Sequence, residues 1–430
     1  MRVPGPGIWS FHSNILDNPA LYFYSLMQEY GDVIRCRSVH DIYLISHPQF
    51  ARDIFQQQAK HLTKEDEVNT RLRRVIGDGV VVTSGDIWRV QRHRAQVTFQ
   101  KKEIQKYTPI VENHAVDFAL KLSAGINSPV ILQEQISQHI LSILLKCLFN
   151  EQDTIIKSKL HKAFASGYEY VANASFINLP DWLPFTKNHK LLNTARLIDL
   201  TLNDMQITHQ KTNRYDGTLL EHLMNFKKED GSFLTPQEVT VEAKNILAAG
   251  HFSTTDLLCW MIYSLALYPE WQQKIRDELA ARGHGTDFQN VPSMQYFIHE
   301  VMRCYPPAWS SWHKTKLDIQ IKDFVIPANK TIIISFFNIH RNPNCWNNPD
   351  DFDPLRFANG LVKQDIFMPF GFGQRKCVGM GLANLIITQT ISNLVCFVNL
   401  KIDSSRPIPK IQSRVTLGSK DPIHLLVSPL

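Results

Sequence analysis

The chain has 430 residues, of which 44% are hydrophobic and 20% charged, as in a large globular protein with a substantial core. Its net charge of +6 comes without a dense Lys/Arg block, so nucleic-acid binding is disfavoured and a basic patch for an acidic partner is favoured. The seven cysteines are odd in number, scattered and without a CxxC pair, which argues for a reducing compartment and against disulfides or a zinc site. No interior linker or repeat is evident, and we expect one domain over residues 1–430.

The chain shows no sign of a membrane-targeting segment. It begins MRVPGPGIWS, without the apolar core of a signal peptide, and no stretch of 18 apolar residues follows. We therefore expect no transmembrane anchor in this chain and a cytoplasmic protein or one attached peripherally to a membrane. Removal of an N-terminal anchor is an alternative that the sequence leaves open.

Taken in chain order, the predicted elements are mainly helical. Proline at residue 19 and glycine at residue 31 bound a helix that ends at Tyr30. Residues 32–38 and 42–46 alternate like a hairpin, and helical patterns then dominate from about Pro48 to Met302. Three later segments are strand-like, the last of them predicted as a small hairpin: residues 316–327, 331–337 and 415–427. The fold class is mainly α with a minor β portion.

One predicted helix is exceptionally long. Thr235, Pro236 and Glu238 form a capping box with proline at the first helical position. The helical pattern then continues to Tyr268, which gives a length of roughly 50 Å. Such a helix is too polar to span a membrane, but it can cross a whole globule and form one wall of a site.

The most informative segment is FGFGQRKCVG, residues 370–379. Cys377 closes this glycine-rich loop just before an apolar run, residues 382–395, which predicts a helix. Free amide groups and the helix dipole at that N-terminus favour thiolate over thiol. A thiolate ligand with an open opposite face suits haem iron, whereas an isolated cysteine is more often a small buried hydrophobic residue.

The loop fits the pattern F-x-x-G-x-R-x-C-x-G and resembles the haem-binding loop of the cytochrome P-450 family, the haem-thiolate monooxygenases. The matching residues are Phe370, Gly373, Arg375, Cys377 and Gly379. The resemblance implies haem b as cofactor and Cys377 as the ligand of its iron. It also implies the family fold, with haem between the long central helix and the helix that follows the cysteine loop.

A second set of residues resembles a structural motif of the same family. Glu300 and Arg303 stand three apart on one predicted helix, and the sequence FDPLRF follows with Arg356. By resemblance these three form a network behind the haem that supports folding and haem retention. An ordinary surface ion pair is the alternative.

Further haem contacts are implied by resemblance in two other segments. Trp88 and Arg92 share one helical face and would donate to the haem propionates, although packing or a cation–π contact is the alternative. His313 stands where the family often has arginine and is able to donate to the same propionates.

The middle of the long helix departs from the family pattern. The family often reads A-G-x-(acid)-T-T where this chain has Ala249, Gly250, His251, Phe252, Ser253 and Thr254. By resemblance Ser253, Thr254 and His251 are the catalytic candidates, but Phe252 replaces the acid and cannot carry a proton. His251, Asp256 or water would have to substitute, and bonding of the hydroxyls to their own helix is the alternative.

The resemblance implies a substrate pocket and a reaction. The pocket candidates are Ala249, Phe252, Ala308, Trp309 and Leu417, which favour a small apolar substrate such as a lipid or terpenoid. We expect hydroxylation with O2 and electrons from a separate ferredoxin or flavodoxin/reductase, received on a basic face at residues 88–102 and Lys376. The alternatives are a peroxygenase, isomerase or dehydratase that needs no reductase, and a haem- or ligand-binding protein without turnover.

Overall fold

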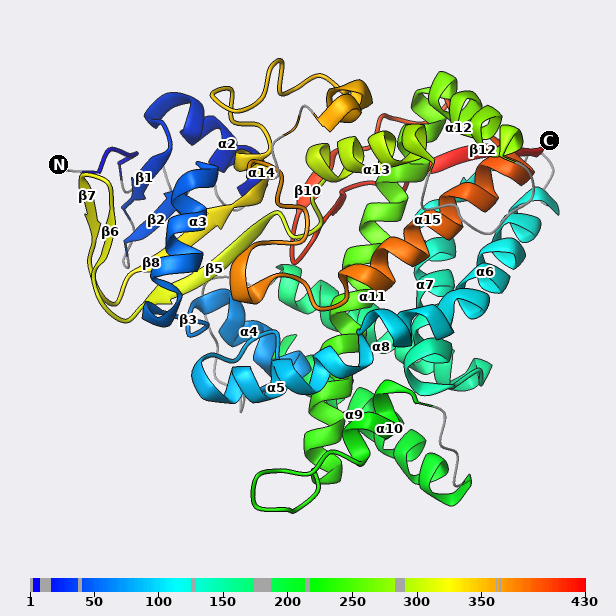
Figure 1. The fold of residues 1–430 in the computed structure, drawn as a ribbon, viewed down its shortest axis with the longest axis horizontal. Helices are drawn as coiled ribbons and strands as arrows, with labels where there is room; N and C mark the ends of the chain where they lie inside the picture. Colours follow the sequence, from blue (N-terminus) through cyan, green and yellow to red (C-terminus); the bar gives the residue numbers. More distant parts are fainter. Residues whose placement is uncertain are drawn as a thin grey trace.

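A computed structural model gives the fold (Figure 1). The structure describes residues 3–7, 17–37, 41–124, 129–173, 187–212, 217–282, 291–360, 362 and 365–430. The largest sheet lies with several short helices at one side of the molecule (Figure 1). Long helices make up most of the other side, where the last strand of the chain also lies, beside the C-terminus (Figure 1). The expected mainly α fold with a minor β portion is confirmed.

The helices follow the predicted order. Five of the α-helices begin with proline in their first turn, where the missing N–H costs no hydrogen bond. The α-helices are α2 (Pro19–Tyr30), α3 (Pro48–Gln57), α4 (Glu67–Ile76), α5 (Gly85–Thr98), α6 (Lys101–Ala124), α7 (Leu132–Phe149), α8 (Thr154–Asn173), α9 (Lys187–Thr212), α10 (Leu219–Met224), α11 (Pro236–Leu267), α12 (Pro269–Ala281), α13 (Pro292–Cys304), α14 (Phe336–Ile339) and α15 (Met380–Phe397). Short 3-10 turns are η1 (Ala59–His61), η3 (Pro354–Gly360) and η4 (Gly373–Arg375).

Two helices frame the centre of the helical part. The predicted capping box of α11 is present: the Thr235 hydroxyl accepts from the Glu238 N–H at 3.2 Å, and the Glu238 carboxylate accepts from the Thr235 N–H at 2.8 Å. This helix has 32 residues and runs through the helical part, with α15 crossing beside it (Figure 1). Most side chains of α11 and α15 are buried in one large hydrophobic core that α6, α7 and α13 share.

The strands form one five-stranded sheet and three smaller ones. The large sheet has the order β1-β2-β8-β5-β3, in which only β2 and β8 are parallel. The smaller sheets are β4-β12-β9, β6-β7 and β10-β11. The strands are β1 (Val33–Cys36), β2 (Ile42–Ile45), β3 (Leu62–Thr63), β4 (Pro129–Ile131), β5 (Ser310–Thr315), β6 (Ile319–Ile321), β7 (Phe324–Ile326), β8 (Thr331–Ser335), β9 (Val398–Ile402), β10 (Ile411–Ser413), β11 (Leu417–Ser419) and β12 (His424–Pro429).

The predicted hairpin over residues 415–427 is wrong. Its two halves form separate strands, since β11 pairs with β10 whereas β12 pairs with β9 and β4. The reason lies in the core: Leu425 and Val427 of β12 are fully buried, and pairing with β9 places them on the large hydrophobic core. A three-residue partner such as β11 would have left half of this six-residue strand unpaired.

One helix of the described ranges, α15, has the length and hydropathy of a membrane span. Of this segment 67% is buried inside the protein, as expected for a core helix that meets the same criteria.

Candidate functional site

The cysteine loop is held by backbone hydrogen bonds between its two ends. The Cys377 N–H donates to the Phe370 carbonyl at 2.9 Å, and the Lys376 N–H donates to the Gly373 carbonyl at 3.1 Å. Gly373 has φ of 66°, and a side chain there would lie 3.3 Å from the Phe55 backbone oxygen. This position therefore requires glycine, both for its backbone angle and for its close approach to α3.

The thiol of Cys377 lies between opposing influences. Its side chain keeps accessible surface, yet the surrounding protein desolvates it and raises its pKa. The Gly379 N–H and the charges of Arg92 and Lys376 act in the opposite direction. The Gly379 N–H at the helix start therefore favours the thiolate, in the expected direction, but desolvation by the surrounding protein outweighs it. A bound metal cation would stabilise the thiolate further.

Two arginines and a tryptophan gather beside this loop. The Arg375 guanidinium stacks over the Trp88 ring at 4.5 Å and donates to the Thr83 carbonyl at 2.6 Å. Desolvation and then the charge of Arg92 lower the pKa of Arg375 to about 10. Arg92 is also desolvated, which lowers its pKa, and its buried Nε has no hydrogen-bond partner. The structure therefore brings α5 and the cysteine loop together, as the resemblance implied.

Lys64 joins the same cluster, although no motif in the sequence singles it out. Its side chain is only 9% exposed, and its Nζ donates to the Trp312 carbonyl at 2.8 Å. Desolvation lowers its pKa to about 7, with Asp66 opposing and Arg375 adding to the effect. His313 is buried beside it, bonds to Ser311 at 2.8 Å, and has its pKa pushed well below its usual range by desolvation and by the charges of Lys64 and Arg375.

This cluster fits the propionate groups of a haem. Within the described ranges, Lys64, Arg92 and Arg375 form no ion pair, although all three are desolvated. Buried cations without a facing anion are costly, and a carboxylate bound between them would relieve that cost. Haem presents two such carboxylates together with an iron that a thiolate binds.

Glu300, Arg303 and Arg356 form an ion-pair network around one fully buried carboxylate. Arg303 pairs with Glu300 in a bidentate manner, with both N–O distances at 2.8 Å and both side chains 0% exposed. Arg356 of η3 reaches the same carboxylate at 3.1 Å, and the Asp353 N–H donates to it at 2.8 Å. The remaining donors of Arg303 bind backbone carbonyls of His340, Pro349 and Asp351. The network ties α13 to the loop before the cysteine.

The middle of α11 places its polar residues on different sides. The Ser253 hydroxyl donates to the Ala249 carbonyl at 2.6 Å within its own helix. His251, two residues earlier, lies on roughly the opposite face, where its Nε2 bonds to Ser137 at 2.9 Å. Ser137 in turn bonds to His161 of α8 at 2.9 Å. The structure therefore does not bring His251 and Ser253 together, and Thr254 is buried.

Phe252, which stands where the family often has an acid, is part of an aromatic cluster. The Phe252 ring lies 4.9 Å from the Tyr168 ring and 5.9 Å from the Phe164 ring, both on α8. Asp256, one turn after Phe252, accepts a hydrogen bond from Thr416, whose hydroxyl lies 2.9 Å from that of Tyr168. Desolvation raises the pKa of Asp256 to about 6, while the Thr416 hydrogen bond lowers it.

The remaining pocket candidates differ in accessibility. Ala308 is exposed, and Ala249 is accessible on α11. Trp309 and Leu417 are buried, with 4% and 0% exposure, in a core cluster that includes Phe23 of α2. These two side chains pack within the core and offer little surface to a ligand. Tyr168 and Thr416, which sequence reasoning missed, belong to the polar group around Asp256; their contacts span α8, α11 and the β10–β11 turn.

Comparisons with known proteins identify the family of the chain. A family model described as Cytochrome P450 matches residues 3–426. Among solved structures, one titled "Crystal structure of a Cytochrome P450 (CYP102L1)" superposes with a TM-score of 0.88 at 15% identity, covering 100% of this chain and 99% of that one. Another, "Retinoic acid bound cyanobacterial CYP120A1", has a TM-score of 0.84 at 18% identity and covers 94% of this chain and 93% of that one.

Curated relatives carry hydroxylase names. The human protein "Cytochrome P450 4A11" is 26% identical over 81% of this chain and 73% of its own length. The mouse "Leukotriene-B4 omega-hydroxylase 3" is 26% identical over 90% and 80% of the two chains. The Arabidopsis thaliana "Abscisic acid 8'-hydroxylase 4" is 24% identical over 91% and 85%.

The fold and the family match together define a haem-dependent oxidoreductase. The chain belongs to the cytochrome P450 family, and the protein is a P450-type monooxygenase. Family membership implies a haem cofactor, O2, a redox partner and an apolar substrate.

Proposed function

We propose that this protein hydroxylates a small apolar organic molecule of the lipid or terpenoid kind, with O2 and electrons delivered by a separate ferredoxin or flavodoxin/reductase. The observation that carries the proposal is the group of desolvated cations beside the Cys377 loop, which fits a haem bound by its propionates. The names of the relatives, which include a leukotriene and an abscisic acid hydroxylase, support a lipid-like substrate.

Each part of the site has a role under this proposal. Cys377 would ligate the iron of haem b, and Arg92, Arg375, Lys64, His313 and Trp88 would hold its propionates. A thiolate-ligated haem supplies the oxygen activation of this family. The Ser253 hydroxyl would hold a proton or a water beside the reacting centre, and the Phe252 ring would keep further water out. The Glu300 network would hold the loop in place.

The reduced, carbon monoxide-bound absorption spectrum of the purified protein tests this proposal. A thiolate-type band is expected, because the Cys377 thiol is accessible to the haem iron and the neighbouring cations would bind the haem propionates. Turnover of an apolar substrate should then require both O2 and a reductase system. A protein without bound haem, or a haem spectrum without thiolate ligation, would contradict the proposal.

A specific observation favours a second candidate function. The acid position holds Phe252, and the Ser253 hydroxyl donates to its own helix at Ala249, so no described acid is seen to feed protons from that turn. A peroxygenase, isomerase or dehydratase does not reduce O2 and therefore needs no delivery of protons to reduced O2. Full turnover with peroxide alone, or rearrangement of a substrate without any reductase, would select this alternative.

A further inference from the structure

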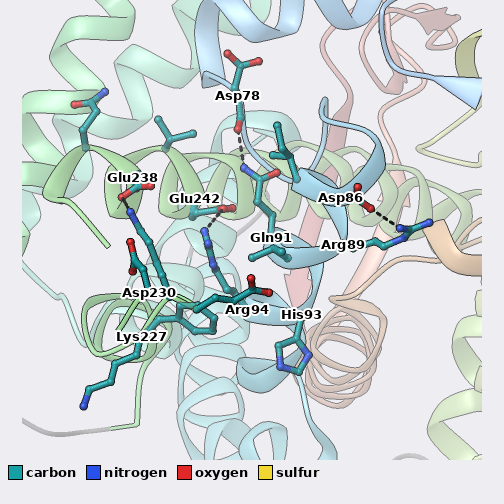
Figure 2. Close-up of a pocket in the computed structure, with 17 residues that line it drawn as sticks. Asp78, Asp86, Arg89, Gln91, His93, Arg94, Lys227, Asp230, Glu238 and Glu242 are labelled. Atoms are coloured by element: carbon teal, nitrogen blue, oxygen red, sulfur yellow. Dashed lines mark hydrogen bonds and ion pairs between the residues drawn. The ribbon is translucent and has the colours of Figure 1, made fainter. Parts of the chain in front are cut away.

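A groove lies on the side of α5 that faces away from Trp88 and Arg92, the residues beside the cysteine loop. It runs between α5, the first turns of α11 and the segment 226–230, and has a volume of about 980 Å³ (Figure 2). Small-molecule sites typically have volumes of about 300–1,000 Å³. Among the described residues that line it, none belongs to the candidate haem contacts. The groove is therefore a separate site.

The groove has a buried carboxylate among its lining residues. Glu242 of α11 is only 2% exposed, and its Oε1 lies 3.4 Å from the Arg94 guanidinium. Its other oxygen, Oε2, is buried and has no hydrogen-bond partner. Figure 2 shows Glu242 and Arg94 reaching toward each other across the groove from α11 and α5. A buried acceptor without a donor is unfavourable, so a ligand that supplies an N–H would be stabilised there.

Arg94 contacts only one of the two carboxylate oxygens of Glu242. Its guanidinium stacks over the Phe226 ring at 4.8 Å, and its Nε is also buried without a partner. The neighbouring Gln91 donates to the Asp78 carbonyl at 2.7 Å. Desolvation raises the pKa of Glu242 to about 7, although Arg94 and Gln91 both act to lower it. The carboxylate is therefore only partly compensated by the protein, and one of its buried oxygens has no hydrogen-bond partner.

The charge and polarity of the walls define what kind of ligand fits. Six acidic and four basic residues line the groove. Four of the acids are in ion pairs, which leaves Glu229 and Asp230 as the lining acids without an ion pair among the described residues, a small acidic excess that favours a cation. Ile87 and Val90 offer apolar surface on α5, with 66% and 41% exposure. A molecule with an apolar body and a cationic donor head would cover these side chains and reach Glu242.

We propose that this groove is a second ligand site, distinct from the haem pocket, for a small amphipathic organic cation whose N–H donors bind the Glu242 carboxylate. Its occupant would contact α5, which also carries Trp88 and Arg92 on another face.

Calorimetric titration of the haem-loaded protein with octylguanidinium tests the site. This probe keeps its charge and donors at every working pH and has no free lone pair for iron. We expect saturable binding to one site, without a change in the haem absorption spectrum. Glu242→Gln, which keeps the shape of the side chain, should weaken binding at least about tenfold, as loss of a charge-assisted hydrogen bond does.

Matched controls separate this site from non-specific attraction. Glu229→Gln removes the same charge from the rim and should leave octylguanidinium binding nearly unchanged. Octyltrimethylammonium keeps the chain and the charge without N–H donors and should bind more weakly than octylguanidinium. Val90→Trp fills the groove without touching a charge and should abolish binding, which keeps the test valid if Glu242→Gln fails to fold.

Three results would overturn the proposal: no saturable binding of octylguanidinium, equal binding by Glu242→Gln or Val90→Trp, or displacement of the probe by imidazole bound at the haem iron. The last result would place the probe in the haem pocket.

Discussion

Cys377 illustrates how a single residue depends on its cofactor. Desolvation raises the pKa of the thiol, while the Gly379 N–H and the Arg92 charge act against it. Iron binding would turn this balance toward thiolate, since a coordinating thiol is deprotonated. The accessible position of the thiol distinguishes it from Cys36, Cys147, Cys259 and Cys304, which are all buried.

The first prediction concerns this ligand. Cys377→Ala should lose the thiolate-type spectrum of the reduced, carbon monoxide-bound protein, because no other cysteine occupies that loop. Cys377→His should be able to keep haem but lose oxygenation. A Cys377→Ala protein that retained the thiolate spectrum would show that another cysteine is the ligand.

Asp256 provides a prediction for pH. Its pKa is raised from 3.8 to about 6, chiefly by desolvation, so the folded state disfavours the charged form. Folding stability is therefore reduced above pH 6, and the loss disappears as pH falls below about 4, where both states bind the proton. Asp256→Asn should raise the unfolding free energy at pH 8 by at most about 3 kcal/mol, with little change at pH 4. Denaturant unfolding at both pH values measures this, and an equal effect at both would contradict it.

At the scale of elements, α13 and η3 depend on one buried carboxylate. Glu300 binds Arg303, Arg356 and a backbone N–H at once, so removal of either charged partner leaves the other unpaired in the core. Glu300→Ala and Arg303→Ala should each cost about 3–5 kcal/mol and yield little soluble, haem-loaded protein. Asp86→Ala, which breaks an exposed pair at the same spacing, should leave the unfolding midpoint almost unchanged. Well-folded Glu300→Ala protein with slow turnover would instead place the residue in the active site.

The middle of the long helix α11 has Phe252 in place of the acid that the family often has there, next to the hydroxyl of Ser253. If Ser253 and water supply protons, Ser253→Ala should uncouple the enzyme, so that reductant is consumed and peroxide is released in place of product. Phe252→Asp should improve coupling, provided that α8 tolerates the loss of the ring contacts with Tyr168 and Phe164. Peroxide released per electron pair measures both effects, with Ser264→Ala on the same helix as control. Unchanged coupling in Ser253→Ala, together with full activity on peroxide alone, would favour the peroxygenase or isomerase function.

Features that depend on residues close together in the sequence could be predicted, whereas contacts between residues far apart in the chain could not. The capping box of α11 and the helix after Cys377 are local patterns, and both are present where predicted. The pairing of β12 with β9 was missed because it depends on burial of Leu425 and Val427 in a distant core. Lys64 was missed for the same reason, since its neighbours Trp312 and Arg375 lie more than 200 residues away in the chain.

At the scale of the whole molecule, the net charge of +6 favours association with an acidic partner. Lys101, Lys102 and Lys376 are exposed near the start of α6 and the cysteine loop. By contrast, Arg94 is occupied by Glu242 and Arg89 by Asp86, so α5 itself offers less free charge than its sequence suggests. We expect an acidic electron donor to be attracted mainly by these three lysines.

The last prediction tests this surface through the reduction rate. Replacing Lys101 and Lys102 together by Glu should slow reduction by an acidic ferredoxin or flavodoxin several-fold at low ionic strength, because like charges lower the rate of encounter. The difference from the unmodified protein should shrink as salt rises, since exposed charges are screened within about 8 Å at physiological ionic strength. Lys316→Glu, an exposed position directly after β5 of the five-stranded sheet, should have little effect. Stopped-flow reduction at several salt concentrations measures this; equal rates for the double variant and the unmodified protein at low salt would move the docking surface elsewhere.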